Sequence, residues 1–152
     1  MDVTYVNPFI KATINVFKTM IGTETKPGKP TLKKEKSPTF DISGIIGLSG
    51  QAQGSITLSF PKLVALKIVS NMLDTKIKVV GPEVSDGVGE IVNIVAGNAK
   101  QDLARYQLSI SLPQVVVGKN HEIARLSGVP ALVVPFGSDL GEFAMEVSLK
   151  SG

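Results

Sequence analysis

The sequence predicts a single α+β domain over residues 1–152, in which an antiparallel-rich β-sheet packs against long α-helices. Three observations lead to this class. Apolar residues recur at helical spacing over residues 82–105, they alternate with polar residues over residues 142–149, and glycine-containing turns separate short extended segments. A chain of 152 residues is long enough for one hydrophobic core and gives little reason for two.

The first expected element is a helix from Pro8 to Ile21, which an irregular first turn starting near Asp2 can precede. Asn7 suits its N-cap, Pro8 its first turn and Gly22 its end. A connector follows, and it carries much of the basic excess behind the net charge of +3, in the residues Lys26, Lys29, Lys33, Lys34 and Lys36. Prolines and a glutamate interrupt this run, and no aromatic residue accompanies it. These features favour a solvated connector, or an edge strand whose lysines block edge pairing, over a nucleic-acid surface.

A hairpin and a second helix are expected next. The strands are predicted at Phe40–Leu48 and Ser55–Phe60, joined by the glycine-assisted turn of residues 49–54. The second helix is predicted from Pro61 to Leu73, with Ser59 available as a cap. Its buried face is expected to comprise Leu63, Leu66, Val69, Ser70 and Leu73.

A long third helix is predicted over residues 82–105, followed by a β-rich segment. Pro82 and Glu83 belong to the first turn of this helix, where an acidic side chain complements the helix dipole. The last strand alternates clearly between apolar and polar residues. The strands of this segment are expected at Leu108–Val117, Ala131–Phe136 and Glu142–Leu149.

The third helix has one polar stripe and one apolar side. At roughly 100° per residue the stripe falls within an arc of about 80°. Its residues are Asp86, Glu90, Asn93, Gly97 and Lys100. The apolar side is expected to face the core through Val84, Val88, Ile91, Val95 and Ala99.

This stripe is interpreted as a docking face with Glu90 and Asn93 at its centre. The two residues are three positions apart, so their side chains point the same way out of the fold. Gly89 lies on one shoulder of the stripe. Gly89 and Gly97 each cost the helix about 1 kcal/mol relative to alanine, and they are expected to offer a side-chain-free surface that another backbone can approach. Asp86 and Lys100 complete the expected partner-binding set.

A solvated helix face is the alternative to a functional stripe. Two observations weigh against it. Asparagine is a poor residue for a helix interior, and three glycines destabilise the same helix. Local choices that oppose local structure are expected where function is served.

Several chemistries are poorly supported by the sequence. The chain has no cysteine, and its one histidine, His121, lies in a polar segment, so a transition-metal site is not expected. There is no nucleophile elbow, P-loop or dinucleotide fingerprint. The sequence shows neither a signal peptide nor an apolar stretch long enough to span a bilayer, and a cytoplasmic protein without membrane or nucleic-acid partners is expected.

The pair at the centre of the stripe restricts the chemistry further. A carboxamide is no general base, but Asn93 can donate and accept hydrogen bonds and so hold a water molecule in line with an electrophile. A carboxylate would repel a phosphoryl group, so Glu90 is better suited to pair with a cation on a partner. The pair suits hydrolysis of a labile phosphoryl group that another protein presents.

At these residues the sequence resembles the CheX–CheC–FliY family of chemotaxis phosphatases, and its CheX branch in particular. The family pattern is an Asp or Ser, three residues, Glu, two residues, Asn and a downstream proline. It reads here as Asp86-Gly87-Val88-Gly89-Glu90-Ile91-Val92-Asn93, with Pro113 as the candidate proline. The amino-terminal segment 6–10 and the glycine-rich segment 47–55 also resemble CheX, so the resemblance covers nearly the whole chain.

The resemblance implies dephosphorylation of a CheY-type response regulator. It implies that Asn93 places the attacking water and that Glu90 pairs with a regulator lysine, while Asp86 caps or buttresses the helix. It also implies that the phosphorylated regulator supplies Mg²⁺, with no cofactor or metal of this chain's own. Two-site members repeat the motif on the first helix, where this chain has Thr4 in place of Glu, so one site is expected. A homodimer is expected because CheX proteins form one.

Two other functions compete with the phosphatase. A non-catalytic binding module would use the same face to recognise a response regulator or a flagellar-switch protein. It predicts binding without turnover. A nucleic-acid-binding protein would use the lysine connector and would show steeply salt-dependent affinity.

Overall fold

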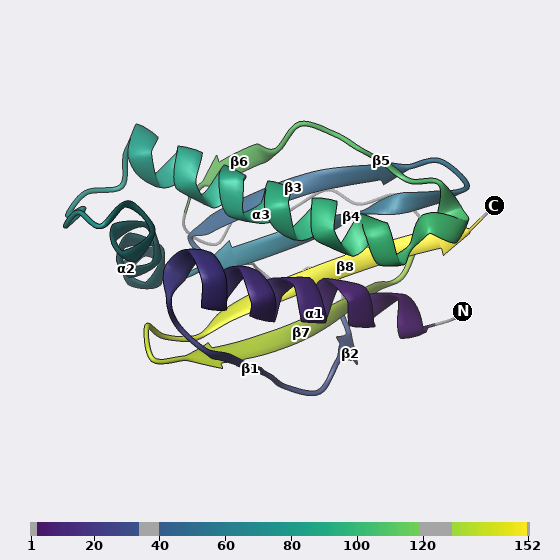
Figure 1. Cartoon of the computed structure of the whole chain (residues 1–152), viewed down its shortest axis with the longest axis horizontal. Helices are drawn as coiled ribbons and strands as arrows, with labels where there is room; N and C mark the ends of the chain where they lie inside the picture. The colour runs from purple at the N-terminus through teal and green to yellow at the C-terminus, as the bar shows by residue number, and fades with distance from the viewer. Residues whose placement is uncertain (1–2, 34–39, 119–128, 152) are drawn as a thin grey trace.

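The computed structural model describes residues 3–33, 40–118 and 129–151. Its strands are β1 (Thr25–Pro27), β2 (Thr31–Leu32), β3 (Ile42–Ser49), β4 (Ala52–Phe60), β5 (Ser109–Ile110), β6 (Gln114–Val117), β7 (Ala131–Ser138) and β8 (Phe143–Ser151). Within the described residues they form one antiparallel sheet in the order β1-β7-β8-β4-β3-β5, with β2 also beside β7 and β6 also beside β3 (Figure 1).

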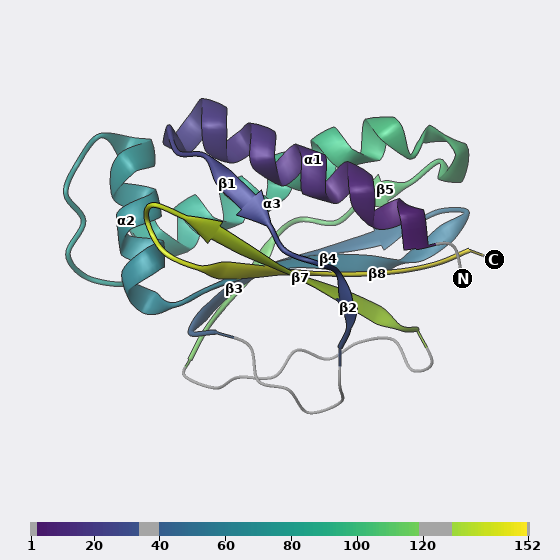
Figure 2. The same ribbon diagram turned by 90° about the horizontal axis from the view of Figure 1, so that it is seen from below.

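The helices lie over one face of this sheet (Figure 2). They are η1 (Val3–Tyr5), α1 (Val6–Val16), η2 (Phe17–Ile21), α2 (Lys62–Leu73), α3 (Pro82–Asp102) and η3 (Ala104–Tyr106). Helices α1 and α3 pack side by side along the strands, and α2 lies at one end of this layer (Figure 1). The structure confirms the predicted α+β class.

Four phenylalanines form the aromatic part of the core. Phe143 of β8 stacks on Phe17 of η2, with ring centroids 4.6 Å apart and planes 6° apart. On β7, Phe136 stacks on Phe143 at 5.0 Å and 3°. The ring of Phe60 in β4 lies 5.2 Å from that of Phe143. Phe143 therefore joins three separate elements, and such pairs contribute about 1 kcal/mol each beyond the burial of area.

The amino-terminal helix has the irregular first turn that was predicted, as η1 (Val3–Tyr5), and its α-helical part begins two residues before the predicted Pro8. α1 starts at Val6 with Tyr5 at its N-cap position, and no side chain caps it. The predicted cap, Asn7, is wrong: the residue lies inside the first turn, and so does Pro8. A proline is tolerated there because the first turn's N–H groups have no intrahelical partner. The predicted end is confirmed, since Gly22 is left-handed with φ 78°.

The β3–β4 hairpin is tighter than predicted. The strands extend to Ser49 and Ala52, which leaves Gly50 and Gln51 as the turn. Gly50 has φ +134°, and a Cβ there would lie 2.5 Å from the carbonyl oxygen of Gln107. The turn therefore requires glycine because a neighbouring segment packs against it.

Helix α2 differs from its prediction in cap and in face. Its first N–H, that of Lys62, donates to Asp41 Oδ2 at 2.8 Å. Ser59, the predicted cap, instead accepts a hydrogen bond from the Phe40 N–H at 2.9 Å. Leu63 and Leu73 are 69% and 46% exposed, so the predicted face is wrong for these two residues. The buried residues of α2 are Val64, Ala65, Leu66, Ile68 and Val69.

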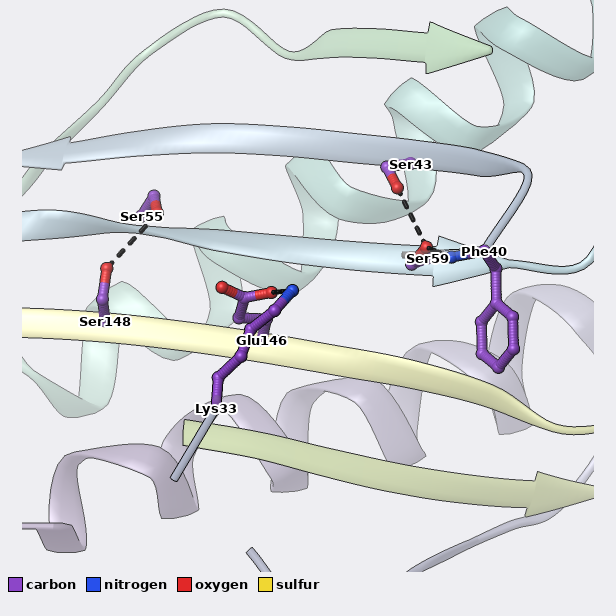
Figure 3. A network of polar contacts seen from close by, with 7 residues as sticks. All are labelled: Lys33, Phe40, Ser43, Ser55, Ser59, Glu146 and Ser148. Atoms are coloured by element: carbon purple, nitrogen blue, oxygen red, sulfur yellow. Dashed lines mark hydrogen bonds and ion pairs between the residues drawn. The ribbon is translucent and has the colours of Figure 1, made fainter. Parts of the chain in front are cut away.

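The sheet face turned away from the helices carries a polar network (Figure 3). Ser43 donates to Ser59 Oγ at 2.9 Å, and the hydroxyls of Ser55 and Ser148 lie 3.4 Å apart. Lys33, which follows β2, reaches Glu146 of β8 on this face. The predicted edge strand in the lysine connector is confirmed by β1 and β2. A fully solvated run is wrong for Lys33, while Lys34 and Lys36 lie outside the described residues.

Candidate functional site

Helix α3 presents the predicted stripe on its exposed side. The five residues expected to face the core are fully buried: Val84, Val88, Ile91, Val95 and Ala99. On the opposite side, Asp86, Glu90 and Lys100 are exposed, while Asn93 and Gly97 are partly buried. The predicted division of the helix into a core side and an outer side is confirmed.

The polar groups of Glu90 and Asn93 do not stabilise the described part of the fold. Neither side chain forms a hydrogen bond or an ion pair with another residue of the described ranges 3–33, 40–118 and 129–151. Their polar atoms are thus available to a ligand or a partner. Asn93 is partly buried, which limits the positions its short side chain can reach.

Gly89 occupies a different environment from the one predicted. It is buried, and a Cβ built on it would lie 3.5 Å from Val115 Cγ2 and 3.7 Å from Pro113 Cγ. The expectation of an exposed, side-chain-free surface at Gly89 is therefore wrong. The glycine instead faces the segment that leads into β6. This contact also brings Pro113 against the turn of α3 that carries Glu90.

Two further glycines of α3 play different parts. Gly87 faces α2, and a Cβ there would lie 2.8 Å from Val69 Cγ2 and 3.1 Å from Met72 Cε. It therefore permits the close approach of two helices, a packing role that the sequence did not assign to it. Gly97 is partly buried and would have open space around a Cβ, as the predicted free surface requires. The glycines of the helix are visible in the sequence as a sign of close packing. The residues that pack against them come from distant segments and could not be identified from the sequence.

The described residues were compared with the side-chain clusters that bind metal ions in proteins. No group of three or more histidine, cysteine, aspartate or glutamate residues within them could hold a metal ion. His121 lies outside the described residues. Among the helices of the described chain, none is long and apolar enough to cross a membrane.

The side chains at the centre of the stripe are suited to positioning other groups. It offers one carboxamide and one carboxylate on a rigid helix, in a surface that includes no histidine of the described ranges. An amide can orient a water molecule, and an exposed carboxylate can pair with a cation.

Comparison with known proteins identifies the family. The family model described as chemotaxis phosphatase CheX matches residues 42–137, which include the strands β3 and β4 and the whole of α3. The chain belongs to the CheX family. This result confirms the resemblance drawn from the α3 motif and from the glycine-rich hairpin.

Three similar proteins match this chain over nearly the full length of both. A CheC-like superfamily protein from Shewanella sp. PV-4 is 40% identical, with a TM-score of 0.91 over 99% of this chain and 100% of that one. The CheY-P phosphatase CheX of Thermotoga maritima is 28% identical over 100% of this chain and 99% of that protein. The CheX–CheY–BeF3–Mg²⁺ complex from Borrelia burgdorferi contains a chain 28% identical, with a TM-score of 0.83 over 99% of this chain and 100% of that chain.

Proposed function

We propose that this protein hydrolyses the aspartyl-phosphate of a CheY-type response regulator. The observation that carries the proposal is the exposed α3 stripe of a CheX-family chain, in which Glu90 and Asn93 have no partner among the described residues. The Thermotoga maritima relative is a CheY-P phosphatase, and the Borrelia burgdorferi relative is complexed with CheY, BeF3 and Mg²⁺. Beryllium fluoride is a chemical analogue of a phosphoryl group, so that complex supports a phosphorylated regulator as the substrate.

Asn93 acts in this proposal by placing the attacking water. Its amide oxygen accepts a hydrogen bond from the water, and its NH2 group donates to an oxygen near the reacting centre. The water oxygen bonds to phosphorus while the bond from phosphorus to the aspartate oxygen breaks. The electron pair of that bond stays on the carboxylate, and the phosphate product carries both hydrogens of the water. Correct placement alone accelerates such a step by orders of magnitude.

Glu90 acts as the docking residue. It lies one turn from Asn93 and is exposed, so it can meet a partner's cation, such as a regulator lysine. An ion pair at this position fixes the orientation of the complex before the water is placed. Asp86, Gly97 and Lys100 extend the docking surface along the same stripe. Gly89 contributes indirectly, through its buried contact with the segment at Pro113.

The regulator supplies the metal. Mg²⁺ on the regulator neutralises charge on the phosphoryl group, and the residues described for this chain provide no acidic cluster that could bind it. We also propose that the protein forms a homodimer and lies in the cytoplasm, as predicted from the sequence.

The test measures phosphoryl loss from Mg²⁺-bound phospho-CheY at several concentrations of this protein. Wild type should accelerate the loss, and Asn93→Ala should reduce kcat about 100-fold while binding is retained. Glu90→Ala should weaken binding. Asn98→Ala is the matched control, because Asn98 is a partly buried asparagine of the same helix that lies off the stripe. Binding without acceleration across all cognate regulators would instead identify a non-catalytic binding module.

A further inference from the structure

A glycine of the sheet lies beneath the helical turn that carries the site. Gly44 is buried in β3, where it pairs with Leu58 of β4 on one side and Val115 of β6 on the other. It shares the helix-facing side of the strand with Ile42 and Ile46, which are 1% and 0% exposed. Because Gly44 has no side chain, a gap lies between the two large side chains of Ile42 and Ile46, directly under α3.

The helix fills this gap closely. A Cβ built on Gly44 would lie 3.0 Å from Val88 Cγ1, 3.0 Å from Val92 Cγ1 and 3.2 Å from the Val88 carbonyl oxygen. Rotating the valine side chains would not relieve the third contact, because that atom belongs to the helix backbone. A methyl group at position 44 therefore raises α3 by a few tenths of an ångström or displaces it sideways.

Sideways movement meets resistance on both flanks. On one flank, Gly87 fits against Val69 of α2, where even a methyl group would be only 2.8 Å from a side-chain carbon. On the other flank, Gly89 faces Pro113 and Val115. The turn of α3 between positions 86 and 93 is consequently bounded on three sides, and the contacts on two of them, at Gly44 and Gly87, depend on glycine.

The residues that rest on Gly44 lie across the helix from the site. At roughly 100° per residue, Val88 and Val92 each point about 160° away from Glu90, and about 140° and about 100° away from Asn93. Any change in the height of the helix above Gly44 passes directly to these two side chains. Asn93 follows Val92 in the chain, and its short, partly buried side chain cannot compensate by changing rotamer.

We propose that Gly44 is a positioning residue for the phosphatase reaction: its missing side chain sets the height of α3 above the sheet and hence the position of the Asn93 amide. This inference rests on the proposed function. It distinguishes the two site residues, because Glu90 is exposed and has a long, flexible side chain that can still reach a partner's cation from a displaced helix. Loss of the glycine should therefore lower kcat much more than it raises KM.

The experiment uses the same Mg²⁺-bound phospho-CheY assay with the full chain. Gly44→Ala should reduce kcat about tenfold with KM changed less than about twofold. Gly47→Ala is the matched control on the same strand, because a Cβ there meets only Ser111, at an ordinary 3.5 Å. It should leave both kinetic parameters unchanged.

Rescue separates positioning from a loss of stability. The double variants Gly44→Ala/Val88→Ala and Gly44→Ala/Val92→Ala each remove one of the two 3.0 Å contacts and keep the contact with the Val88 carbonyl oxygen, so each should recover a measurable part of the lost kcat but not all of it. Each also loses buried methyl groups and should melt at a lower temperature than Gly44→Ala. Higher activity at lower stability is the expected signature.

The kinetic results separate failure of this proposal from failure of the proposed function. Full kcat in folded Gly44→Ala, or no rescue in either double variant, would overturn it while Asn93→Ala still loses activity and the phosphatase assignment stands. No acceleration by wild type would instead remove the proposed function itself. If Gly44→Ala does not fold, Val92→Ile places the extra methyl group from the helix side, and unchanged kcat in that variant would overturn the inference.

Discussion

Lys33 Nζ lies 2.6 Å from Glu146 Oε2, and the two side chains are only 9% and 12% exposed. The lysine comes from the end of an edge segment and the glutamate from β8, 113 residues later (Figure 3). A buried ion pair of this kind adds little net stability over an apolar pair, but removing one partner is costly because the other charge stays buried. The contact therefore secures the β2 segment to the polar face of the sheet.

Lys33→Met should lower the free energy of unfolding by about 3 kcal/mol, because the buried ion pair between Lys33 and Glu146 is then lost. Urea unfolding measures the change. Lys29→Met, at an exposed lysine of the same connector, should stay within about 0.5 kcal/mol of wild type. The double variant Lys33→Met/Glu146→Gln should recover part of the loss. Equal effects at Lys33 and Lys29 would contradict a structural ion pair.

Asp41→Ala should destabilise the protein by about 1 kcal/mol, because the carboxylate caps α2 by accepting the Lys62 N–H at 2.8 Å. Lys62→Ala is the control, since it keeps the backbone donor. Thermal unfolding of both variants gives the comparison. If Lys62→Ala lowered the stability as much as Asp41→Ala does, the capping hydrogen bond would not be the cause of the Asp41→Ala effect.

Tyr5 should make stability decline at high pH. Burial raises the pKa of the Tyr5 phenol above its ordinary value of about 10, and a backbone hydrogen bond at Leu149 offsets part of the shift. The native state therefore keeps its proton at a pH where the unfolded chain releases it. This contribution to stability is complete below about pH 10 and is lost as the pH rises through the folded pKa. Unfolding of Tyr5→Phe should show a shallower decline above pH 10, and parallel curves would refute the assignment.

Asp86→Ala should raise KM for phospho-CheY about twofold and leave kcat unchanged, because an exposed carboxylate at the end of the stripe contributes about 0.5 kcal/mol to docking. Steady-state kinetics separates the two parameters. Asp102→Ala is the matched control at the other end of α3, where the carboxylate lies 4.0 Å from Lys11 and is also exposed. A fall in kcat for Asp86→Ala would instead place this residue at the reacting centre.

Sequence periodicity predicted α3 well and α2 poorly, for one physical reason. The outer and core sides of α3 differ sharply in polarity, so a period of 3.6 residues identifies both. In α2, consecutive apolar residues from Leu63 to Leu66 surround the helix, and periodicity alone cannot choose the buried side. The side of α2 that is covered depends on elements distant in the sequence: α3 at Gly87, η2, and the turn at Gly141, which packs against Val64.

The contacts that shape the site could not be predicted from residues that are neighbours in the sequence. Glu90 and Asn93 could be placed on one face from their spacing, since that relation lies within one helix. Gly89 was assigned to the surface, because nothing near it in the sequence shows that Pro113 and Val115 cover it. The cap of α2 likewise comes from Asp41, 21 residues before its donor. Each missed feature depends on chain segments that meet only in the folded protein.

The position of β8 has a consequence for synthesis. This strand pairs with β4 on one side and β7 on the other, so it joins the two halves of the sheet although it comes last among the described strands. While a ribosome is still making residues 143–151, β3 and β4 can pair, but β7 has no route into the same sheet. Until β8 is available, β4 and β7 each keep one unpaired edge, so the two halves of the sheet cannot join before the last of the described strands is in place.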